Sequence, residues 1–141
     1  MRPVRPLVLS ALCALMVLPS LASADDLKRF ISPSRNIGCF GDAQEVRCDI
    51  GQTSATPPKR PRSCQFDWGD SFFLHPAGKA RGFCHSDSAL PDPNENARVL
   101  AYGTSIKLGR KMRCTSRRTG LTCRSTAGHG FTLSRTVIKL F

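Results

Sequence analysis

Cysteine is the residue type whose spacing indicates the most definite chemistry in this chain. The 141 residues contain seven cysteines, of which one, Cys13, lies in an apolar N-terminal run. The other six are Cys39, Cys48, Cys64, Cys84, Cys114 and Cys123. Cysteines in such numbers form disulfides in an oxidising compartment and tend to bind metals or do redox chemistry in a reducing one. The destination of the protein therefore decides which chemistry applies.

Residues 1–24 predict a secretory signal peptide. Two arginines, Arg2 and Arg5, precede an apolar run over residues 7–21, and small residues at 22–24 provide a cleavage site before Asp25. The apolar run is short for a membrane span, and no second one follows after cleavage. We therefore expect a secreted or periplasmic protein consisting of a single domain, residues 25–141. With six cysteines left in an oxidising compartment, three disulfides are the expected outcome.

The spacing of the cysteines predicts two similar hairpins. Cys39 and Cys48 are separated by eight residues, and so are Cys114 and Cys123, with polar or glycine-containing turns between them. In a hairpin centred on residues 43–44, Cys39 faces Cys48 and the apolar residues share one side, as the period of two requires. We predict disulfides Cys39–Cys48 and Cys114–Cys123, and Cys64–Cys84 by elimination. The alternative is that equivalent cysteines of the two hairpins pair between sheets.

The elements that position these cysteines are predicted to be short strands. A hairpin loop at residues 109–111 keeps the apolar residues on either side of it on one face, and residues 131–141 predict one or two terminal strands. Proline-rich residues 56–62 are expected to run extended over the surface, and Trp68 to pack in the core or on a disulfide. No window shows a helical stripe. We predict an all-β fold, a small disulfide-stapled sandwich or barrel built from hairpins. The repeated cysteine spacing hints at an internal repeat, but two ordinary hairpins explain it as well.

Positive charge is concentrated at the C-terminal end of the chain. The formal net charge is +11, from 21 Lys and Arg against 10 Asp and Glu. Residues 25–106 are balanced, whereas residues 107–141 contain nine basic and no acidic side chains. In the second hairpin these make a basic ridge, for which the candidate ligand-binding residues are Arg113, Arg117, Arg118 and Arg124. Such a ridge attracts anions, or only aids solubility.

Histidine chemistry has weaker support. The chain has three histidines: His75, His85 and His129. A catalytic triad would combine His129 with Asp87, and its serine would be Ser86 or Ser134, but no nucleophile-elbow motif fixes that geometry. His129 lies between two glycines, which favours a packed, hydrogen-bonded residue over a base. We expect no cofactor and no metal site, because the thiols are oxidised and no metal-binding motif is present.

Several segments together resemble a bacterial family of small exported proteins of unknown function. They are residues 30–39 (FISPSRNIGC), 46–50 (VRCDI), the prolines 57, 58 and 61 before Cys64, 67–69 (DWG), 102–103 (YG) and 128–135 (GHGFTLSR). This chain has Arg35 where the family favours glycine, which indicates a turn that tolerates a side chain. The resemblance implies export and a disulfide-bonded domain, and it implies no activity and no catalytic residues.

These observations support three hypotheses. The first is a binding module for an anionic ligand, such as an envelope lipid phosphate, an acidic glycan, nucleic acid or an acidic protein, through the basic C-terminal hairpin. The second is a secreted inhibitor or immunity-type protein that binds a specific, acidic enzyme. The third is a hydrolase that uses His129. We favour a binding role over an enzymatic one.

Overall fold

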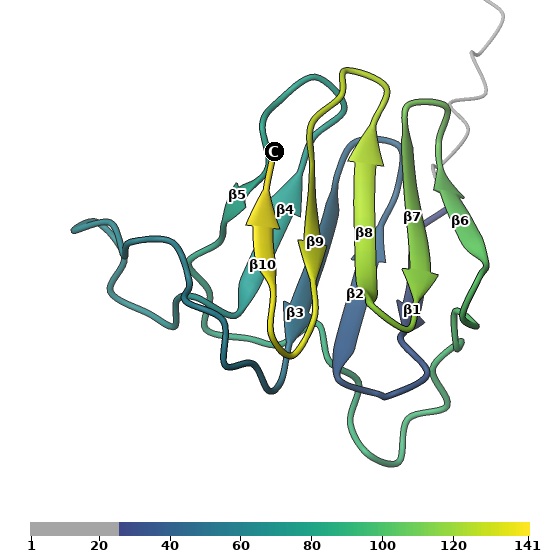
Figure 1. The fold of residues 1–141 in the computed structure, drawn as a ribbon, viewed down its shortest axis with the longest axis horizontal. Coiled ribbons are helices and arrows are strands. Elements are labelled where there is room, and N and C mark those ends of the chain that lie inside the picture. The colour runs from purple at the N-terminus through teal and green to yellow at the C-terminus, as the bar shows by residue number, and fades with distance from the viewer. Residues whose placement is uncertain (1–25) are drawn as a thin grey trace, which may run out of the picture.

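The computed structural model describes residues 26–141, which form a two-layer β-sandwich (Figure 1). These residues contain ten strands in two five-stranded antiparallel sheets packed face to face. The all-β prediction is confirmed, and of the two predicted architectures, sandwich and barrel, the structure is a sandwich. The predicted signal peptide, residues 1–24 with Cys13, lies outside the described residues. Within residues 26–141 there is no helix long and apolar enough to cross a membrane.

The first sheet is a meander whose strands are neighbours in chain order. Its strands are β1 (Lys28–Ile31), β2 (Ile37–Gly41), β3 (Val46–Ile50), β4 (Ser71–Leu74) and β5 (Arg81–Gly82). The hairpin of β2 and β3 has the predicted register, with Cys39 opposite Cys48 and Ile37 opposite Ile50. Strands β1, β4 and β5 were not predicted, because each is short and lacks a long alternating pattern.

The second sheet repeats this topology. Its strands are β6 (Ser105–Leu108), β7 (Met112–Arg117), β8 (Gly120–Ser125), β9 (Gly130–Leu133) and β10 (Ile138–Leu140), again in chain order. The predicted loop at 109–111 is confirmed, since Leu108 faces Met112. In both sheets the disulfide joins the second and third strands. The similarity that the cysteine spacing hinted at is therefore a repeat of topology over five strands.

All three predicted disulfides are formed. Cys39–Cys48 and Cys114–Cys123 each join directly opposite residues of neighbouring strands, and Cys64–Cys84 lies outside the sheets. The first two point into the space between the sheets, where the Sγ atoms of Cys48 and Cys123 are 3.8 Å apart. The alternative pairing between sheets is thus wrong, although the two disulfides do meet between the sheets.

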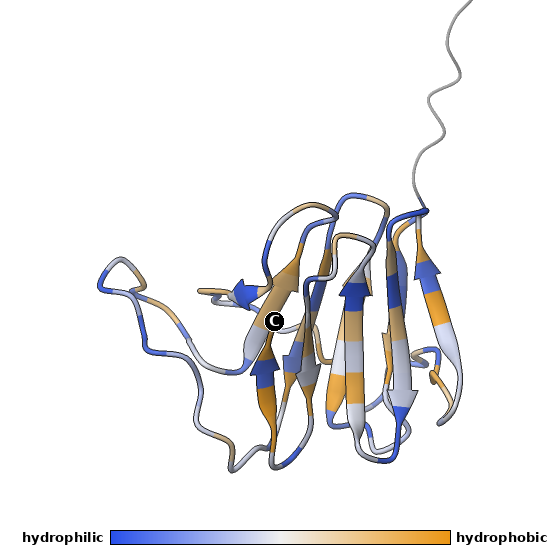
Figure 2. Ribbon diagram, turned by 45° about the horizontal axis from the view of Figure 1, so that its top comes forward, coloured by the Kyte–Doolittle hydropathy of each residue, from blue (hydrophilic) through white to orange (hydrophobic). Residues whose placement is uncertain are grey.

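The core surrounds this contact between disulfides. Hydrophobic and hydrophilic residues alternate along several strands, as the bands of colour in Figure 2 show, and the buried apolar side chains of both sheets form one cluster. The largest fully buried ones include Phe30, Phe72, Phe131, Leu74, Leu108, Leu121 and Leu133. Rings of Phe72 and Phe131 pack across the two sheets with their centroids 6.4 Å apart. Burial of a side chain of this size contributes about 1.5–3 kcal/mol.

A loop between β3 and β4 projects from the side of the sandwich, at the left in Figure 1. We call residues 51–66 the proline arm. Trp68 lies at its base, half-buried, where its Nε1 donates to the Pro58 carbonyl at 2.8 Å. Its ring covers Gly82, where a Cβ would lie 2.7 Å from the indole. The expectation that Trp68 packs in the core is not met, because Trp68 is half-buried beside the sheet, where its indole holds the arm against β5.

The two kinds of disulfide are expected to differ in their contribution to stability. Replacing either pair by alanine removes a loop constraint of about 3 kcal/mol. The Cys114→Ala, Cys123→Ala variant also leaves a cavity in the core, so its loss of unfolding free energy should exceed that of Cys64→Ala, Cys84→Ala. Urea denaturation followed by far-ultraviolet circular dichroism measures both. Equal losses of unfolding free energy for the two variants would contradict the conclusion that the Cys114–Cys123 disulfide is part of the hydrophobic core.

Candidate functional site

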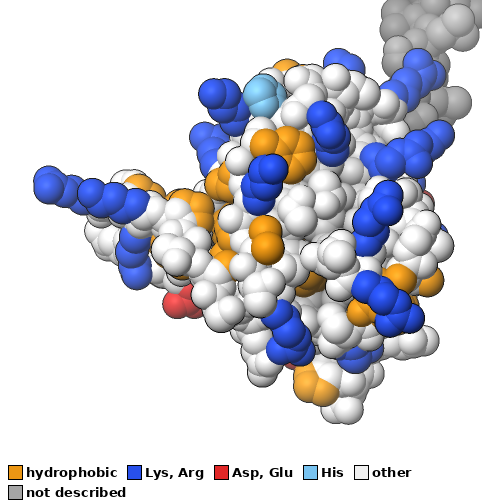
Figure 3. Space-filling model, viewed as in Figure 1, with side chains coloured by type: hydrophobic (Ala, Val, Ile, Leu, Met, Phe, Trp, Pro, Cys, Tyr) orange, Lys and Arg blue, Asp and Glu red, His pale blue; other side chains and the backbone are white. Residues whose placement is uncertain are grey.

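The outer side of the second sheet carries a row of exposed cations. Along β7 the side chains alternate between the core and solvent, so that Arg113 and Arg117 point outward while Cys114 is buried. Lys107 on β6 and Arg124 on β8 are also exposed, on the same side. We call Lys107, Arg113, Arg117 and Arg124 the cationic face. Lysine and arginine side chains are spread over this side of the molecule in Figure 3, with little acidic surface in view.

The register places like charges directly opposite one another. Lys107 faces Arg113, and Arg113 faces Arg124, on neighbouring strands about 4.8 Å apart. Like charges in this position destabilise a sheet. Within residues 26–141 none of these three side chains forms a salt bridge with a carboxylate. The arrangement of these charges is therefore unfavourable for the stability of the sheet.

A row of hydroxyl groups runs beside these cations. The next register positions along the sheet are Ser105, Thr115, Thr122 and Thr132, on four consecutive strands. Ser105 Oγ and Thr115 Oγ1 are 2.8 Å apart, and so are Thr122 Oγ1 and Thr132 Oγ1. Arg113, Arg117 and Arg124 line a shallow depression on this surface together with Thr115 and Thr122. The surface can therefore offer both charge and hydroxyl hydrogen bonds to a ligand.

The fourth predicted arginine is separate from the cationic face. Arg118 lies in the turn between β7 and β8, and its guanidinium stacks over the ring of Tyr102, 5.1 Å from the centroid. The structure thus brings together three of the four predicted residues, Arg113, Arg117 and Arg124. Arg118 belongs instead to a pocket at the end of the sandwich. Arg117 also lines this pocket, so it borders both surfaces.

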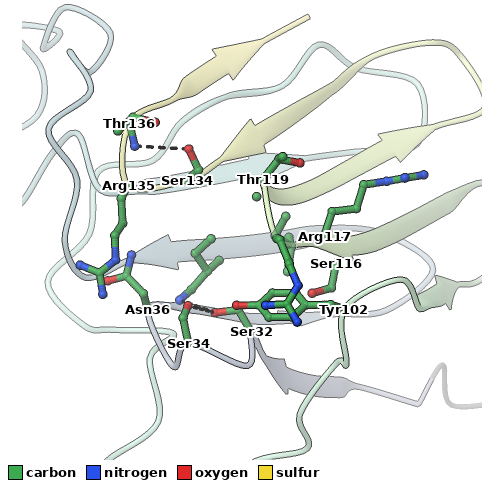
Figure 4. A pocket seen from close by; sticks show the side chains of 14 residues that line it. Ser32, Ser34, Asn36, Tyr102, Ser116, Arg117, Thr119, Ser134, Arg135 and Thr136 are labelled. Atoms are coloured by element: carbon green, nitrogen blue, oxygen red, sulfur yellow. Dashed lines mark hydrogen bonds between the residues drawn. The ribbon is translucent and has the colours of Figure 1, made fainter.

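This end pocket, of about 280 Å³, was not predicted (Figure 4). It lies where the turns after β1, β7 and β9 meet, and these supply Ser32, Arg118 and Arg135. Ser32 and Ser34 are hydrogen-bonded at 3.1 Å, between Arg135 on one side and Tyr102 on the other (Figure 4). Segments that are far apart in the sequence form this pocket. The sequence therefore indicates the polar turns one by one but does not indicate that they meet.

The turn after β1 explains the residue at position 35. Arg35 has a φ of 57°, in the left-handed region that glycine occupies readily. A residue with a Cβ is disfavoured there by about 1–2 kcal/mol. The turn is held by Asn36, whose Nδ2 donates to the Gln52 carbonyl at 2.9 Å and whose Oδ1 accepts from Gln52 N at 2.8 Å. The turn therefore accepts the arginine side chain, as the resemblance indicated.

The outer side of the first sheet has a different organisation, built on buried Arg47 of β3. Its Nε and Nη2 donate to the two carboxylate oxygens of Asp49 at 3.0 and 2.8 Å, and Nη1 donates to Asp87 at 2.8 Å. Ser71 Oγ donates to Asp49 at 2.6 Å. The guanidinium packs over the ring of Phe83, 4.8 Å from its centroid. The charges of Arg47, Asp49 and Asp87 are thus paired within the chain, which marks a structural network. Arg29 and Arg81, exposed on the same side, pack over the rings of Phe40 and Phe73.

The Arg47 network holds residues 84–90, the covering segment, over this sheet. Ala89 N donates to Asp49 at 2.6 Å, and the segment passes so close to β2 that a Cβ at Gly38 would lie 2.6 Å from the Ala89 carbonyl oxygen. Burial opposes the charge of Arg47, but its bonds to Asp49 and Asp87 outweigh burial and raise its pKa. The hydrogen bond from Arg47 in turn lowers the pKa of Asp87. This network was not predicted from the sequence, although two charged residues, Arg47 and Asp49, alternate with apolar ones in Val46–Ile50.

His85 anchors the start of the covering segment. Its Nε2 is 2.8 Å from Asp70 Oδ1, and its Nδ1 contacts the carbonyl oxygen of Asp87. Both partners only accept hydrogen bonds, so only the protonated imidazole, with two N–H donors, satisfies both. Burial opposes the charge, but the bonds to Asp70 and Asp87 outweigh burial and raise the pKa of His85.

The residues of the hypothetical triad are not brought together. His129 lies in the turn after β8, whereas Ser134 follows the opposite end of β9. Asp87 lies in the covering segment on the outer side of the first sheet, bound to Arg47. Among the described residues the His129 imidazole is half-buried and makes no hydrogen bond, so the expected hydrogen bond is not seen. The geometry therefore offers His129 no nucleophile and no orienting acid.

Comparison with known proteins gives a family without an assigned role. Residues 9–141 match the model of a family of unknown function (DUF6636). No curated protein and no solved structure shows a significant match to the chain.

The raised pKa of His85 predicts a pH dependence of stability. Because the folded pKa lies above the unfolded value of about 6.5, the contribution of His85 is complete below that pH and is lost as pH rises through the folded pKa. Urea unfolding between about pH 5 and pH 8 should show wild type losing more stability than His85→Gln as pH rises. An Asp70→Asn variant should show an intermediate slope. Parallel curves for wild type and His85→Gln would refute the assignment.

Proposed function

We propose that this chain, which belongs to that family of unknown function, is an exported module that binds an acidic polysaccharide across its cationic face. The observation that carries the proposal is the pair of like-charge contacts, Lys107 with Arg113 and Arg113 with Arg124, on directly opposite residues. A row of cations at strand spacing suits a chain of anionic groups that crosses the strands.

The chemistry of the surface favours a glycan over the other anions. The hydroxyl row from Ser105 to Thr132 offers donors and acceptors that suit sugar hydroxyls. Binding of single-stranded nucleic acid commonly uses a series of aromatic rings for stacking. Phe131 is buried, and Phe141, just after β10, is half-buried with the guanidinium of Arg124 over its ring, 5.5 Å from the centroid, so the cationic face presents no such series among the described residues. Insertion into a lipid surface needs exposed apolar side chains, and the outward positions of β7 and β8 are arginine and threonine.

Export to an oxidising compartment is part of the proposal. It is supported by the three disulfides, which are rare in reducing compartments, and by the signal-peptide pattern of residues 1–24. Acidic polysaccharides of the cell envelope or its surroundings are accessible from there.

Neutralising two central arginines tests the proposal. The variant Arg113→Gln, Arg124→Gln also removes the repulsion between these residues, so it should fold at least as stably as wild type. We expect its affinity for polygalacturonate to fall about tenfold, and wild-type affinity to fall steeply with added salt. The matched control, Lys59→Gln, Arg62→Gln on the proline arm, changes the net charge equally and should bind within about twofold of wild type.

Single-stranded DNA and vesicles rich in phosphatidylglycerol serve as competing probes in the same titrations. If the protein bound either probe more tightly than polygalacturonate, that probe's class, and not an acidic polysaccharide, would be the ligand. Equal losses in the two double variants would show that net charge alone, with no defined face, governs binding.

A second candidate function, inhibition of an acidic enzyme, is favoured by the proline arm. The arm projects from the sandwich and contains three basic and no acidic residues. Arg60 donates to the carbonyls of Cys64 and Phe66 at 3.1 and 2.6 Å, and the Cys64–Cys84 disulfide fixes its base. Phe66 is 61% exposed. A rigid loop that presents an aromatic side chain is suited to insertion into a partner's cleft.

The arm and the cationic face can be tested independently. If the protein is an inhibitor, the immobilised chain should retain one acidic enzyme in stoichiometric amount from culture fluid. Phe66→Ala should abolish that retention, whereas Arg113→Gln, Arg124→Gln should leave it intact, because interface energy concentrates in buried aromatic anchors. Retention that Phe66→Ala leaves unchanged would exclude the arm as the inhibitory element.

A further inference from the structure

The end pocket contains a buried hydroxyl group that the protein leaves without a partner. Ser116 is only 1% exposed and lines the pocket. Its Oγ has no hydrogen-bond partner among residues 26–141. Ser116 occupies an inward position of β7, at the end of the core, where Leu121 is its cross-strand neighbour. Buried hydroxyls in proteins are nearly always hydrogen-bonded, so the hydroxyl of Ser116, beside the pocket, leaves a donor and an acceptor for a polar group bound there.

Three arginines, Arg117, Arg118 and Arg135, line the pocket and make it positive, and two of them are held in place by neighbouring side chains. Arg118 stacks on Tyr102, and Arg135 is held from the other side by its Nη1 bond to Gln52 Oε1 at 2.8 Å. Among the described residues neither forms a salt bridge with a carboxylate, and no acidic residue lines the pocket. Guanidinium groups fixed in this way, with free N–H donors, are suited to an oxyanion.

The pocket also offers hydroxyl groups and an apolar wall. Ser32 and Ser34 lie between Arg135 and Tyr102 (Figure 4), and Ile37 and Leu121 are the aliphatic residues of the lining. Its volume of about 280 Å³ is at the small end of the range for organic ligands. A bare ion would leave the hydroxyl groups of the lining without hydrogen bonds, whereas a sugar-sized polyol carries hydroxyls of its own to pair with them.

From these features we infer that the end pocket binds the phosphate monoester of a small polyol, such as a sugar phosphate. A phosphate monoester carries close to two negative charges and three acceptor oxygens, which matches the two guanidinium groups better than a carboxylate does. The hydroxyl groups of the ligand would meet Ser32, Ser34 and Ser116. The inference goes beyond the proposed polysaccharide binding, because it rests on Ser116, Arg118 and Arg135, which lie outside the cationic face.

Isothermal titration of residues 25–141 with glucose 6-phosphate tests the inference. We expect one saturable site, with affinity about tenfold above that for inorganic phosphate or glucuronate, and no measurable binding of glucose. Ser116→Ala removes a hydroxyl without a partner, so it should fold at least as stably as wild type and yet bind about tenfold more weakly. Arg135→Gln should weaken binding by at least as much.

The outcomes separate this inference from the proposed function. Arg113→Gln, Arg124→Gln should bind glucose 6-phosphate within about twofold of wild type, even if it no longer binds polysaccharide. Equal affinity for inorganic phosphate and glucose 6-phosphate, or for glucuronate, would overturn the assignment of the ligand class. Unchanged affinity in Ser116→Ala would show that its hydroxyl serves no ligand, and would overturn the inference.

Discussion

The contact between two disulfides at the centre of the sandwich governs the rest of the structure. Sγ atoms of Cys48 and Cys123 meet at 3.8 Å, and each belongs to a disulfide that locks the second and third strands of its sheet. A strand has a period of two, so fixing one inward residue on each strand fixes all the outward ones. Once Cys114 and Cys123 face the core, Arg113 and Arg124 must face solvent, opposite one another.

The two sheets share a topology but differ in whether the charged side chains at the centre of their outer surfaces have partners within the chain. On the first sheet, Arg47 is buried and bonded to Asp49 and Asp87, and the covering segment excludes solvent. On the second sheet, Arg113 and Arg124 are exposed and have no acidic partner among the described residues. Charges that are paired with opposite charges within the chain serve the fold. Like charges on opposite positions of neighbouring strands do not stabilise the fold, and they are available to bind an anion. This asymmetry is the reason why we propose that the ligand binds on the second sheet.

Local patterns in the sequence were enough to predict the two hairpins, because a disulfide between opposite residues and a period of two both act over a few residues. The same period of two places Arg113 and Arg124 on the side opposite the cysteines of their strands. The Arg47 network was not predictable, since Asp87 is 40 residues away and contact depends on the path of the covering segment. The end pocket was missed for the same reason, because three separate turns form it. Strand β4, with only four residues, was too short to be distinguished from a loop.

The most direct test of this account is to map a bound acidic oligosaccharide by nuclear magnetic resonance. Oligogalacturonate would be titrated into ¹⁵N-labelled protein while amide shifts are followed along every strand. The account predicts that the largest changes fall on the amides of β7 and β8 and their neighbours β6 and β9, with β1–β5 unaffected. Changes confined to the first sheet or the proline arm, or spread evenly over all surface cations, would contradict it.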